Sequence, residues 1–455
     1  MLRAFRRPAH RALTRLPALV LLAGTLLSAC TPSAPAPAAT SKPAGSTAPA
    51  AAPVAPAGSP AASPVASPAA AAAPSKPSGP APSSIKLGAV IPLTGRYASL
   101  GDQVKSGYEL AVDDINKAGG VMVNSYGTKI PLELKILDDE SDPTKTVQRH
   151  ETLDSTDQVV AHLGGAGSDL HTAAATVAEK NRVPYMGIAF ALFQVHQKGL
   201  KYLFSPFEKS PAVAKSSFDI MDSLNPKPTK VAIFAEQTDW GAELRDLWSK
   251  EAKARNYELV ADEQYAPGSK DFAPMVLKAK AANADAVLSM PNPPDGLAIV
   301  KQMKELDFNA KFYYLIRAPD GLAWSQNLGK DGDYVVLAPG WSPDLKFPGV
   351  DQIKQAHQAR YNKSAEALVG PSYACIQILA NAIERAGTLD HDQLRDAIAA
   401  TDMMTVEGPV KFNPDGTGQV LVIANQWQDG KPVLVWPKDV AVAPLAYPAK
   451  PWRER

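Results

Sequence analysis

The sequence predicts an α/β protein with two lobes, each built on a doubly wound parallel β-sheet that helices cover on both faces. Short apolar runs alternate with amphipathic helical patterns from residue 85 onward, and this rhythm is typical of parallel sheets. The rhythm breaks off after residue 188 and starts again at Lys230, which indicates a second lobe. A chain of 455 residues is long enough for two domains of ordinary size.

The first lobe is predicted from a unit of strand and helix that repeats. Ile85–Ile91 is an apolar run that ends at Pro92, as expected of a buried strand. Residues 102–118 then carry apolar side chains at intervals of three and four, and Gly119-Gly120 ends this helix. The unit continues with strands at 132–137, 159–163 and 185–188 and helices at 143–156 and 169–180.

The second lobe is predicted from the same unit and closes on a hairpin. Its strands are expected at 230–235, 259–264, 286–289, 312–315 and 334–337, and its helices at 240–255, 272–282 and 295–306. Three further helices are expected at 350–362, 371–386 and 390–399. Strands at 420–427 and 433–436 then flank the pair Asp429-Gly430, which suits a hairpin turn. Residues 441–455, with several Pro and Ala, are expected to be a loose tail.

The first 30 residues indicate a targeting segment. Five Arg and no acidic residue accompany an apolar run at 16–27, which at 12 residues is too short for a membrane span. The run ends in Leu27-Ser28-Ala29-Cys30, which resembles the lipobox of bacterial lipoproteins. We therefore predict a signal peptide at 1–29 and a lipidated Cys30 that anchors the chain to a bacterial membrane. An ordinary signal peptide with a chance cysteine is the alternative.

Residues 30–84 combine the lipidated Cys30 with a predicted disordered tether. After the cysteine the segment is almost wholly Ala, Pro, Ser, Gly and Thr, and Lys42 and Lys76 are its only charges. Such a composition buries too little apolar surface to offset the entropy of ordering. We expect it to link the membrane to the folded body.

Charge and cysteine content exclude several classes of function. Without the five Arg of the targeting segment, 42 Lys and Arg face 46 Asp and Glu, so we expect no nucleic-acid partner. Cys30 and Cys375 are the only cysteines, too few for a disulfide framework or a metal cluster. We interpret Cys375 as a small apolar helix residue, with a catalytic thiol as the alternative.

Several short motifs occur in the order and spacing of one known family. They are Gly88-Ala89-Val90-Ile91-Pro92-Leu93-Thr94-Gly95, Asn116-Lys117-Ala118-Gly119-Gly120-Val121, Asp138-Asp139, Trp240-Gly241, Pro319-Asp320-Gly321 and Gly408-Pro409. Through them, residues 85 to about 437 resemble the type I periplasmic binding proteins of the leucine/isoleucine/valine-binding family. The family's lobe-one disulfide would be missing, because Ser141 and Gly164 stand where its cysteines would be.

The resemblance implies a hinge in which the chain crosses between the lobes three times. The crossings would lie near Ser205–Lys209, Ala338–Trp341 and Val406–Pro409. Lobe one would then be 85–207 with 339–407, and lobe two 208–338 with 408–440. The lobes would close on a small solute, and the permease of an ABC importer would recognise the closed form.

The predicted ligand site in lobe one lies in three loops. The turn Gly164-Gly165-Ala166-Gly167-Ser168 precedes a helix, so its free N–H groups could hold a carboxylate; a tight turn without a ligand is the alternative. The resemblance adds Tyr97 and Leu100 in the first loop. It also adds Ala189-Phe190-Ala191, where Phe190 either lines the cleft or packs in the core. From these loops we name Tyr97, Leu100, Gly165, Ala166, Ser168, Ala189, Phe190 and Ala191 as ligand-binding candidates.

In lobe two, the resemblance implies a site built from Trp240, Asn292 and Asp320. Trp240 would cover the ligand, with a buried core position as its alternative. Asp320 would pair with a ligand ammonium, or serve only as a turn residue. Arg317, three residues earlier, could neutralise Asp320 or bind an acidic group of the ligand.

We conclude from the sequence that the chain is a solute-binding protein and not an enzyme. No catalytic motif and no nucleotide-binding loop is present, His162 and His171 lack metal-ligand spacing, and no cofactor or metal is expected. A ligand sensor of the same fold is the first alternative, and a tethered hydrolase the second. The expected ligand is an amino acid or a similar compound, then an aromatic or aliphatic carboxylate, then an amide or urea-like solute.

Overall fold

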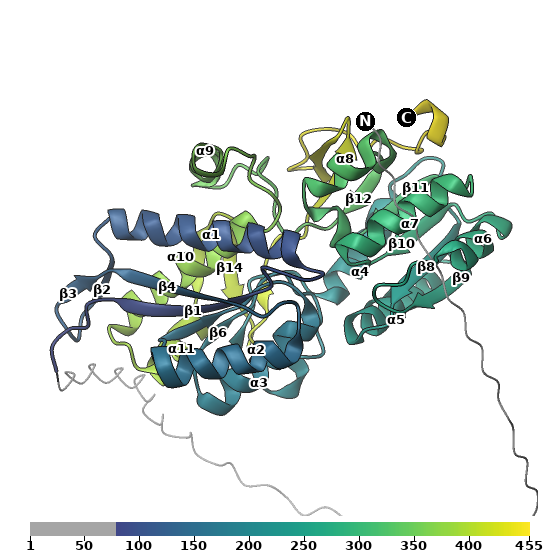
Figure 1. Ribbon diagram of the computed structural model, residues 1–455. Helices are drawn as coiled ribbons and strands as arrows, with labels where there is room; N and C mark the ends of the chain where they lie inside the picture. The colour runs from purple at the N-terminus through teal and green to yellow at the C-terminus, as the bar shows by residue number, and fades with distance from the viewer. Residues whose placement is uncertain (1–78) are drawn as a thin grey trace, which may run out of the picture. The chain divides into compact units, whose positions relative to one another are not determined.

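The computed structural model describes residues 79–455, so the predicted signal peptide, Cys30 and most of the tether lie outside the described residues. Within this range the parallel strands form two separate sheets (Figure 1). The first sheet has the order β4-β1-β5-β6-β7. The second has the order β17-β16-β12-β11-β10-β8-β9. The predicted strands 85–91 and 230–235 thus fall in different sheets, as two lobes require.

The first sheet is wholly parallel. Its strands are β1 (Ile85–Ile91), β4 (Leu132–Asp138), β5 (Ala161–Leu163), β6 (Tyr185–Met186) and β7 (Leu203–Phe204). Around it lie the helices α1 (Ala98–Lys117), α2 (Pro143–Thr152), α3 (Ser168–Asn181), α9 (Val350–Tyr361), α10 (Val369–Ala386) and α11 (His391–Ala399). Helices α1 and α10 pack together on one face, and α2 and α3 on the other (Figure 1).

The second sheet is parallel except for a hairpin at its edge. Its strands are β8 (Lys230–Glu236), β9 (Glu258–Tyr265), β10 (Ala286–Ser289), β11 (Phe312–Leu315), β12 (Val335–Leu337), β16 (Ala424–Gln428) and β17 (Lys431–Trp436). The turn of the hairpin is Asp429-Gly430, and both residues have positive φ angles, 48° and 74°. This is the conformation that the Asp-Gly pair predicts.

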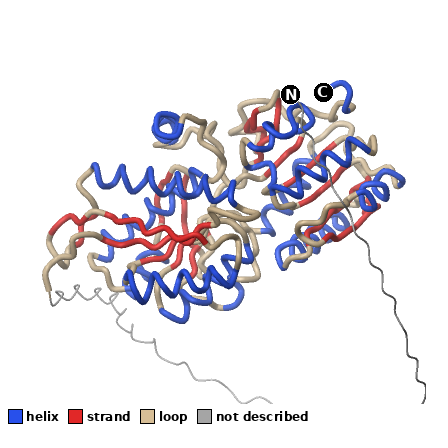
Figure 2. The backbone as a smooth tube through the Cα atoms, in the orientation of Figure 1, coloured by secondary structure: helices blue, strands red, loops and turns tan. Residues whose placement is uncertain are grey.

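Alternate residues of β8 show how helices cover both faces of the second sheet. Val231 and Ile233 pack in one core with α4 (Ser210–Asp222) and α5 (Asp239–Ala254). Ala232 and Phe234 pack in another with α6 (Ala273–Ala281), α7 (Pro293–Glu305) and α8 (Ala323–Leu328). Successive side chains of a strand point to opposite faces, so the continuous apolar run of β8 belongs to a sheet buried on both sides. The tube view shows these layers of helix and strand (Figure 2).

The structure moves the expected third crossing. Residues 408–440 were expected to belong to lobe two, but Gly408–Phe412 form β14, which pairs with β13 (Asp402–Thr405) and β15 (Gly418–Gln419) in a small separate sheet. Val410 and Phe412 complete the core of the first lobe, where the ring of Phe412 lies 5.3 Å from that of Phe204. The chain returns to the second sheet only at β16. The boundary at residue 408 is therefore wrong, because apolar residues of β14 fill the first core.

The expectation of a loose tail at 441–455 is also wrong. The indole N–H of Trp452 donates to the carbonyl of Phe308 at 3.0 Å, and only 9% of Trp452 is exposed. The guanidinium of Arg455 lies 3.7 Å from the centre of the Trp452 ring. The backbone N–H of Ala449 donates to Lys311. A tryptophan that buries its ring and finds an acceptor for its N–H fastens this segment to the second lobe.

Two short strands join α1 to β4. They are β2 (Val121–Val123) and β3 (Thr128–Ile130), which pair as an antiparallel hairpin. Val121, Val123 and Ile130 point into the core of the first lobe. No helix within residues 79–455 is both long and apolar enough to cross a membrane.

Candidate functional site

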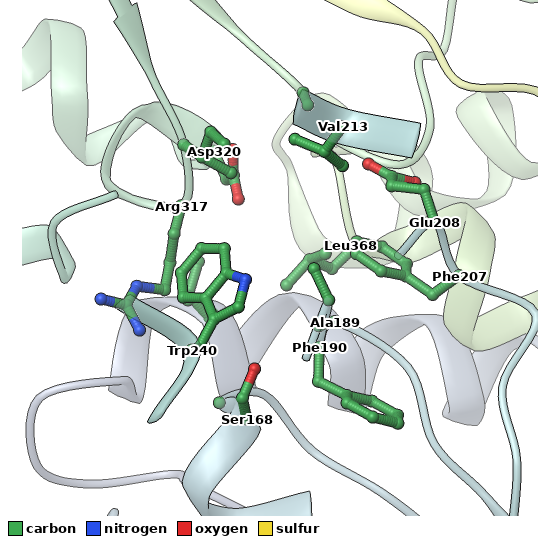
Figure 3. A pocket seen from close by; sticks show the side chains of 15 residues that line it. Ser168, Ala189, Phe190, Phe207, Glu208, Val213, Trp240, Arg317, Asp320 and Leu368 are labelled. Atoms are coloured by element: carbon green, nitrogen blue, oxygen red, sulfur yellow. The ribbon is translucent and has the colours of Figure 1, made fainter. Parts of the chain in front are cut away.

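A small cavity lies between the two sheets, at the carboxyl ends of their parallel strands. Loops after β5 and β6 line it from the first lobe, and the loop after β11 lines it from the second. Ligand sites of open α/β sheets form at these ends. The centres of water molecules can occupy about 30 Å³ of the cavity, and Figure 3 shows side chains that line it.

The N-terminus of α3 provides the positive end of the cavity. Gly167 precedes this helix with φ = 112°, a conformation open mainly to glycine. A Cβ atom at this position would also lie 2.6 Å from the ring of Tyr97. The first amide groups of the helix, beginning with Ser168, have no acceptor within the helix. Their N–H groups and the helix dipole favour an anion such as a carboxylate.

Two carboxylates line the opposite side of the cavity. Asp320 lies in a single 3-10 turn, Ala318–Asp320, and its Oδ1 atom is buried without a hydrogen-bond partner. Glu208, from the first hinge crossing, is 3% exposed. Figure 3 shows both side chains at the cavity. An unpaired carboxylate in a dry site gains most from a cationic partner.

Burial makes these two acids weak. It raises the pKa of Asp320 to about 8, with a further contribution from the nearby charge of Glu208. It likewise raises the pKa of Glu208 to about 7, although Lys209 opposes the shift. The side of the cavity that holds Asp320 and Glu208 can therefore exchange protons near neutral pH.

Arg317 does not offer its charge to the cavity, because its guanidinium already has partners. It pairs with Glu236 at the end of β8 and donates to the carbonyls of Met290 and Pro291. Nη1 donates to the hydroxyl of Tyr97 at 3.2 Å, across the two lobes. Burial lowers the pKa of Arg317, but Glu236 and Tyr97 raise it by more.

The backbone of Arg317 is in a rare conformation. Its φ and ψ angles are 74° and −53°, and the N–H of Ala318 donates to the carbonyl of Ile316 at 2.9 Å. This is a γ-turn of the strained form. Strain of this kind persists where the surroundings hold it, and here the contacts of the guanidinium do so. The turn places Arg317 and Asp320 at the end of β11.

Trp240 lines the cavity from the start of α5 and also belongs to the core. Its indole N–H donates to Ser210 at 3.1 Å, and the guanidinium of Arg317 lies 5.0 Å from its ring centre. A Cβ atom on the next residue, Gly241, would lie 1.8 Å from the carbonyl oxygen of Glu236. Only glycine therefore lets α5 begin this close to β8.

Phe190 contributes to the cavity wall, but its ring is turned into the core. The ring stacks on His171 at 4.3 Å and on His196 at 5.6 Å between centroids. Nζ of Lys209 lies 3.7 Å from the ring centre and donates to the Phe190 carbonyl at 2.8 Å. Of the two interpretations of Phe190, core packing describes the ring.

The structure brings seven of the predicted residues to the cavity wall. They are Leu100, Ser168, Ala189, Phe190, Ala191, Trp240 and Asp320. Tyr97 does not line the cavity but contacts Arg317. That these residues bind a ligand remains a prediction.

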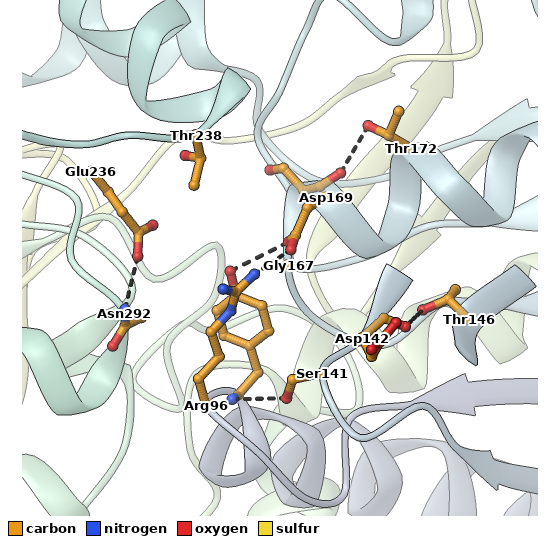
Figure 4. Close-up of polar contacts among 12 residues, drawn as sticks. Arg96, Ser141, Asp142, Thr146, Gly167, Asp169, Thr172, Glu236, Thr238 and Asn292 are labelled. Atoms are coloured by element: carbon orange, nitrogen blue, oxygen red, sulfur yellow. Dashed lines mark hydrogen bonds and ion pairs between the residues drawn. The ribbon is translucent and has the colours of Figure 1, made fainter. Parts of the chain in front are cut away.

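Besides Tyr97, three predicted residues do not line the cavity. Gly165 packs beneath Pro92, where a Cβ atom would lie 2.3 Å from the proline ring, and Ala166 is fully buried. The side chain of Asn292 caps α7 and donates to Glu236 (Figure 4). Their backbone and capping contacts explain these positions without a ligand.

Seven other lining residues were not named as candidates, although Gly167 belongs to the predicted carboxylate-binding turn. They are Gly167, Phe207, Glu208, Val213, Ile316, Ala338 and Leu368. Only Glu208 carries a charge among these. Its position in the predicted crossing Ser205–Lys209 could have identified it as a candidate, since an acidic residue in a crossing is either exposed or faces the cleft. The apolar members have no feature in the sequence that separates them from core residues.

Carboxylates at other points hold the two lobes together. Glu243 on α5 accepts hydrogen bonds from the N–H groups of Phe193 and Gln194, both at 2.8 Å. Glu366 accepts one from the N–H of Leu322, also at 2.8 Å. Arg96, which joins the first loop to Asp169 at α3 (Figure 4), stiffens the first-lobe side.

His150, His162, His171 and Cys375 are buried among structural neighbours. Nδ1 of His150 lies 3.0 Å from Nδ1 of His162, whose Nε2 lies 2.8 Å from Asp154. His171 contacts the Gly167 carbonyl at 2.7 Å. Cys375 is buried on α10, and burial raises the pKa of its thiol. Within residues 79–455, no three His, Cys, Asp or Glu side chains are grouped as metal ligands.

Comparison with known proteins agrees with this geometry. A family model described as periplasmic binding protein matches residues 84–431. A Leu/Ile/Val-binding protein homologue of Brucella abortus is 27% identical over 388 residues, covering 80% of this chain and 93% of that protein. Another Brucella abortus homologue is 24% identical over 394 residues, covering 82% of this chain and 96% of that protein.

Solved structures share the fold at low identity. A leucine-binding protein of Thermotoga maritima gives a TM-score of 0.69 at 20% identity, covering 77% of this chain and 97% of that one. A solute-binding protein of R. palustris in complex with benzoate gives 0.69 at 18% identity, with coverages of 77% and 95%. LivJ of Streptococcus pneumoniae in complex with isoleucine gives a TM-score of 0.67 at 22% identity, covering 78% of this chain and 100% of that one.

These findings confirm the resemblance read from the sequence motifs and the expected two-lobed α/β fold. Proteins of this family bind solutes rather than catalyse reactions, and they work outside the cytoplasm. The chain belongs to the periplasmic binding protein family, of type I.

Proposed function

We propose that this chain is the solute receptor of an ABC importer and that it captures an amino acid or a similar small organic solute between its lobes. One observation carries the proposal: the N-terminus of α3 faces the cavity from one lobe, and Asp320 lines it from the other with an unpartnered oxygen. A free amino acid has a carboxylate for the first and an ammonium for the second.

In this proposal each side of the cavity has a role. The free N–H groups at the start of α3, with the hydroxyl of Ser168, bind the carboxylate. Asp320 and Glu208 bind the ammonium. Leu100 and Trp240 are apolar walls for the side chain. The backbone groups of Ala189 and Ala191 complete the first-lobe side.

The names of similar proteins support an amino acid. Several Brucella relatives are called Leu/Ile/Val-binding protein homologues, and one structural neighbour holds isoleucine. The benzoate complex of another neighbour supports a simple carboxylate as the second class of ligand.

A thermal-shift panel on the purified chain tests the ligand class. An amino acid present at 100 times its Kd should add about 2.7 kcal/mol of stability. Asp320→Asn should reduce the shift given by that amino acid, whereas Asp351→Asn, on the exposed side of α9, should not. If simple carboxylates stabilise the chain and amino acids do not, the ligand is a carboxylate of the second class. Turnover of the ligand would contradict a receptor.

We also propose that a lipid on Cys30 holds the receptor at the membrane. The basic segment, the apolar run and the lipobox support this anchor. Expressed in a bacterial host, the chain should partition into the detergent phase of a Triton X-114 extract. Cys30→Ala should move it to the aqueous phase, while Cys375→Ala, at the buried cysteine, should leave it in detergent. Detergent partitioning of both variants would rule out the anchor.

A further inference from the structure

A second cavity lies beside the first, and Asp320 lines both. Water centres can occupy about 340 Å³ of this second cavity, far more than of the first. We call it the side chamber and define it by Asp320, Trp341, Asp344, Glu366, Asn425 and Trp427. It lies between the lobes, because Glu366 of the α9–α10 loop bonds to the N–H of Leu322 across it.

Two indole rings give the side chamber an apolar wall. Trp341 and Trp427 are at most 1% exposed. The N–H of Trp341 donates to Val406 at 2.9 Å, and that of Trp427 donates to Pro319 at 3.0 Å. Since both N–H groups are used inside the protein, the rings offer only carbon and π surface to an occupant. Such surface suits an alkyl chain or a cation.

The polar groups of the side chamber are mostly acceptors without donors. Oδ1 of Asp320 and Oδ1 of Asn425 are buried and have no hydrogen-bond partner, and Asn425 is 3% exposed. Within the described residues, the carboxylate of Asp344 forms neither an ion pair nor a hydrogen bond. Buried acceptors that remain unpaired are costly. An occupant that brings donors would remove this cost.

The charge of the lining residues selects the kind of donor. Glu366 is balanced by Lys363 at 3.1 Å, so the unbalanced acids are Asp320 and Asp344. Lys431 is the one cation among the lining residues that the structure describes, and it is exposed at the start of β17. The side chamber therefore favours an ammonium or guanidinium group over a neutral or acidic one.

We infer that the side chamber receives the cationic end of the same solute whose α-carboxylate lies at α3, so that the preferred ligand is a basic amino acid rather than an aliphatic one. The inference rests on the proposed function. It leaves the α-ammonium with Asp320 and Glu208 in the main cavity and assigns the terminal cation to the space between Asp344, Asn425 and the two indoles.

Calorimetric titration of the full chain with L-lysine and L-norleucine tests the inference, because the two differ only in the terminal ammonium. We expect L-lysine to bind at least about tenfold more tightly, as for hydrogen bonds to a charged group. Asp344→Asn should lower this lysine-to-norleucine ratio about two- to fivefold, and Lys431→Gln should raise it by a similar factor. Asp439→Asn and Lys438→Gln make the same changes of net charge at exposed positions outside the side chamber, and should leave the ratio as it is.

The possible results separate this inference from the proposed function. Norleucine or leucine binding as tightly as lysine would overturn the inference and leave the amino-acid receptor in place. The absence of binding by any amino acid would overturn both. Equal changes of the lysine-to-norleucine ratio in the control variants would also overturn the inference, because the preference for lysine would then come from the net charge of the protein. Binding of n-butylamine on top of saturating norleucine would show a separate amine site and overturn the single-solute inference.

Discussion

The hydroxyl of Tyr97 accepts a hydrogen bond from Nη1 of Arg317 at 3.2 Å, and so joins the first loop of one lobe to the loop after β11 in the other. The same hydroxyl lies 3.3 Å from Oδ1 of Asp169, to which it can donate. Arg317 in turn pairs with Glu236. A chain of polar contacts thus runs from α3 to β8 across the cavity and belongs to the closed arrangement of the lobes.

Replacing Tyr97 by Phe should loosen this closed arrangement. The variant loses one hydroxyl that contacts both lobes, so we expect about 1 kcal/mol less stability in the closed form. Small-angle scattering of the ligand-free chain should give a larger radius of gyration than the wild type. Tyr126→Phe, in the β2–β3 turn, removes a hydroxyl away from the cavity and should change nothing. Equal scattering for Tyr97→Phe and wild type would contradict a role in closure.

Replacing Arg317 by Met should destabilise the fold strongly. Glu236 is fully buried, and a buried charge left without its partner costs about 3–5 kcal/mol. Urea unfolding followed by tryptophan fluorescence measures this. In the double variant Arg317→Met/Glu236→Gln no unpaired charge remains, so most of the loss should be recovered. Arg360→Met breaks an exposed pair with Asp113 and should cost at most about 1 kcal/mol. A similar loss of unfolding free energy in Arg317→Met and Arg360→Met would show that the buried pair contributes no more to stability than the exposed one.

Asp320 and Glu208 should each contribute a stability that is lost as the pH rises through the neutral range, whereas Lys209, whose pKa burial lowers to about 7, contributes with the opposite sign. The folded pKa of Asp320 is raised from 3.8 to about 8, and that of Glu208 from 4.5 to about 7. Between those limits the folded chain holds protons that the unfolded chain has lost, so each further rise in pH favours unfolding. Measured at several values from pH 5 to 8.5, the unfolding free energy of the wild type should fall relative to that of Asp320→Asn as the pH rises. A slope unchanged by Asp320→Asn would contradict the raised pKa.

The same protons should oppose the binding of a cationic ligand. Asp320 must be ionised to pair with an ammonium group, so the affinity should rise from pH 6 toward pH 8. Calorimetry in buffers of different ionisation enthalpy should report proton release on binding near neutral pH. An affinity independent of pH in this range would mean that Asp320 does not contact the charged group.

Replacing Gly241 by Ala should displace the start of α5. The added Cβ atom would meet the Glu236 carbonyl at 1.8 Å, so the helix must shift and move Trp240 out of the cavity wall. We expect a loss of about 1–3 kcal/mol in unfolding free energy and weaker ligand binding. Ala242→Gly, at an exposed position of the same helix, should cost about 0.5–1 kcal/mol and leave binding intact. If Gly241→Ala binds the ligand as tightly as the wild type, Trp240 has no role in ligand binding.

The order of strands and helices was predictable from short-range patterns. Strands 85–91, 286–289 and 312–315 have the predicted bounds, because each is an apolar run between clear turn residues. The strand at 185–188 is shorter in the structure, ending at Met186, since the chain then turns into the loop at Ala189, where φ is 53°. Strand β14 was assigned to the wrong lobe because its alternating apolar residues suit either core.

The sequence predicted which loops line the candidate site more accurately than how their side chains are oriented. Trp240, Ser168 and Asp320 were placed at one cavity by motif positions alone. The orientation of Phe190 and the ion pair of Arg317 could not be predicted, since both depend on which side chains the fold brings beside them. His171 and His196 draw the Phe190 ring inward, and Glu236 holds Arg317, 81 positions away.

By itself the sequence determined two α/β lobes and the hairpin turn at Asp429-Gly430, because these follow from periodicity and from residues with special backbone preferences. The loops that meet at the cleft followed mainly from the resemblance of its motifs to a known family. Only the tertiary structure decided which charges remain free. Arg317 is neutralised by Glu236, whereas Asp320 has a buried oxygen without a partner. Whether a charge serves the fold or a ligand depends on which groups lie within a few ångströms of it, and these come from separate strands and crossings.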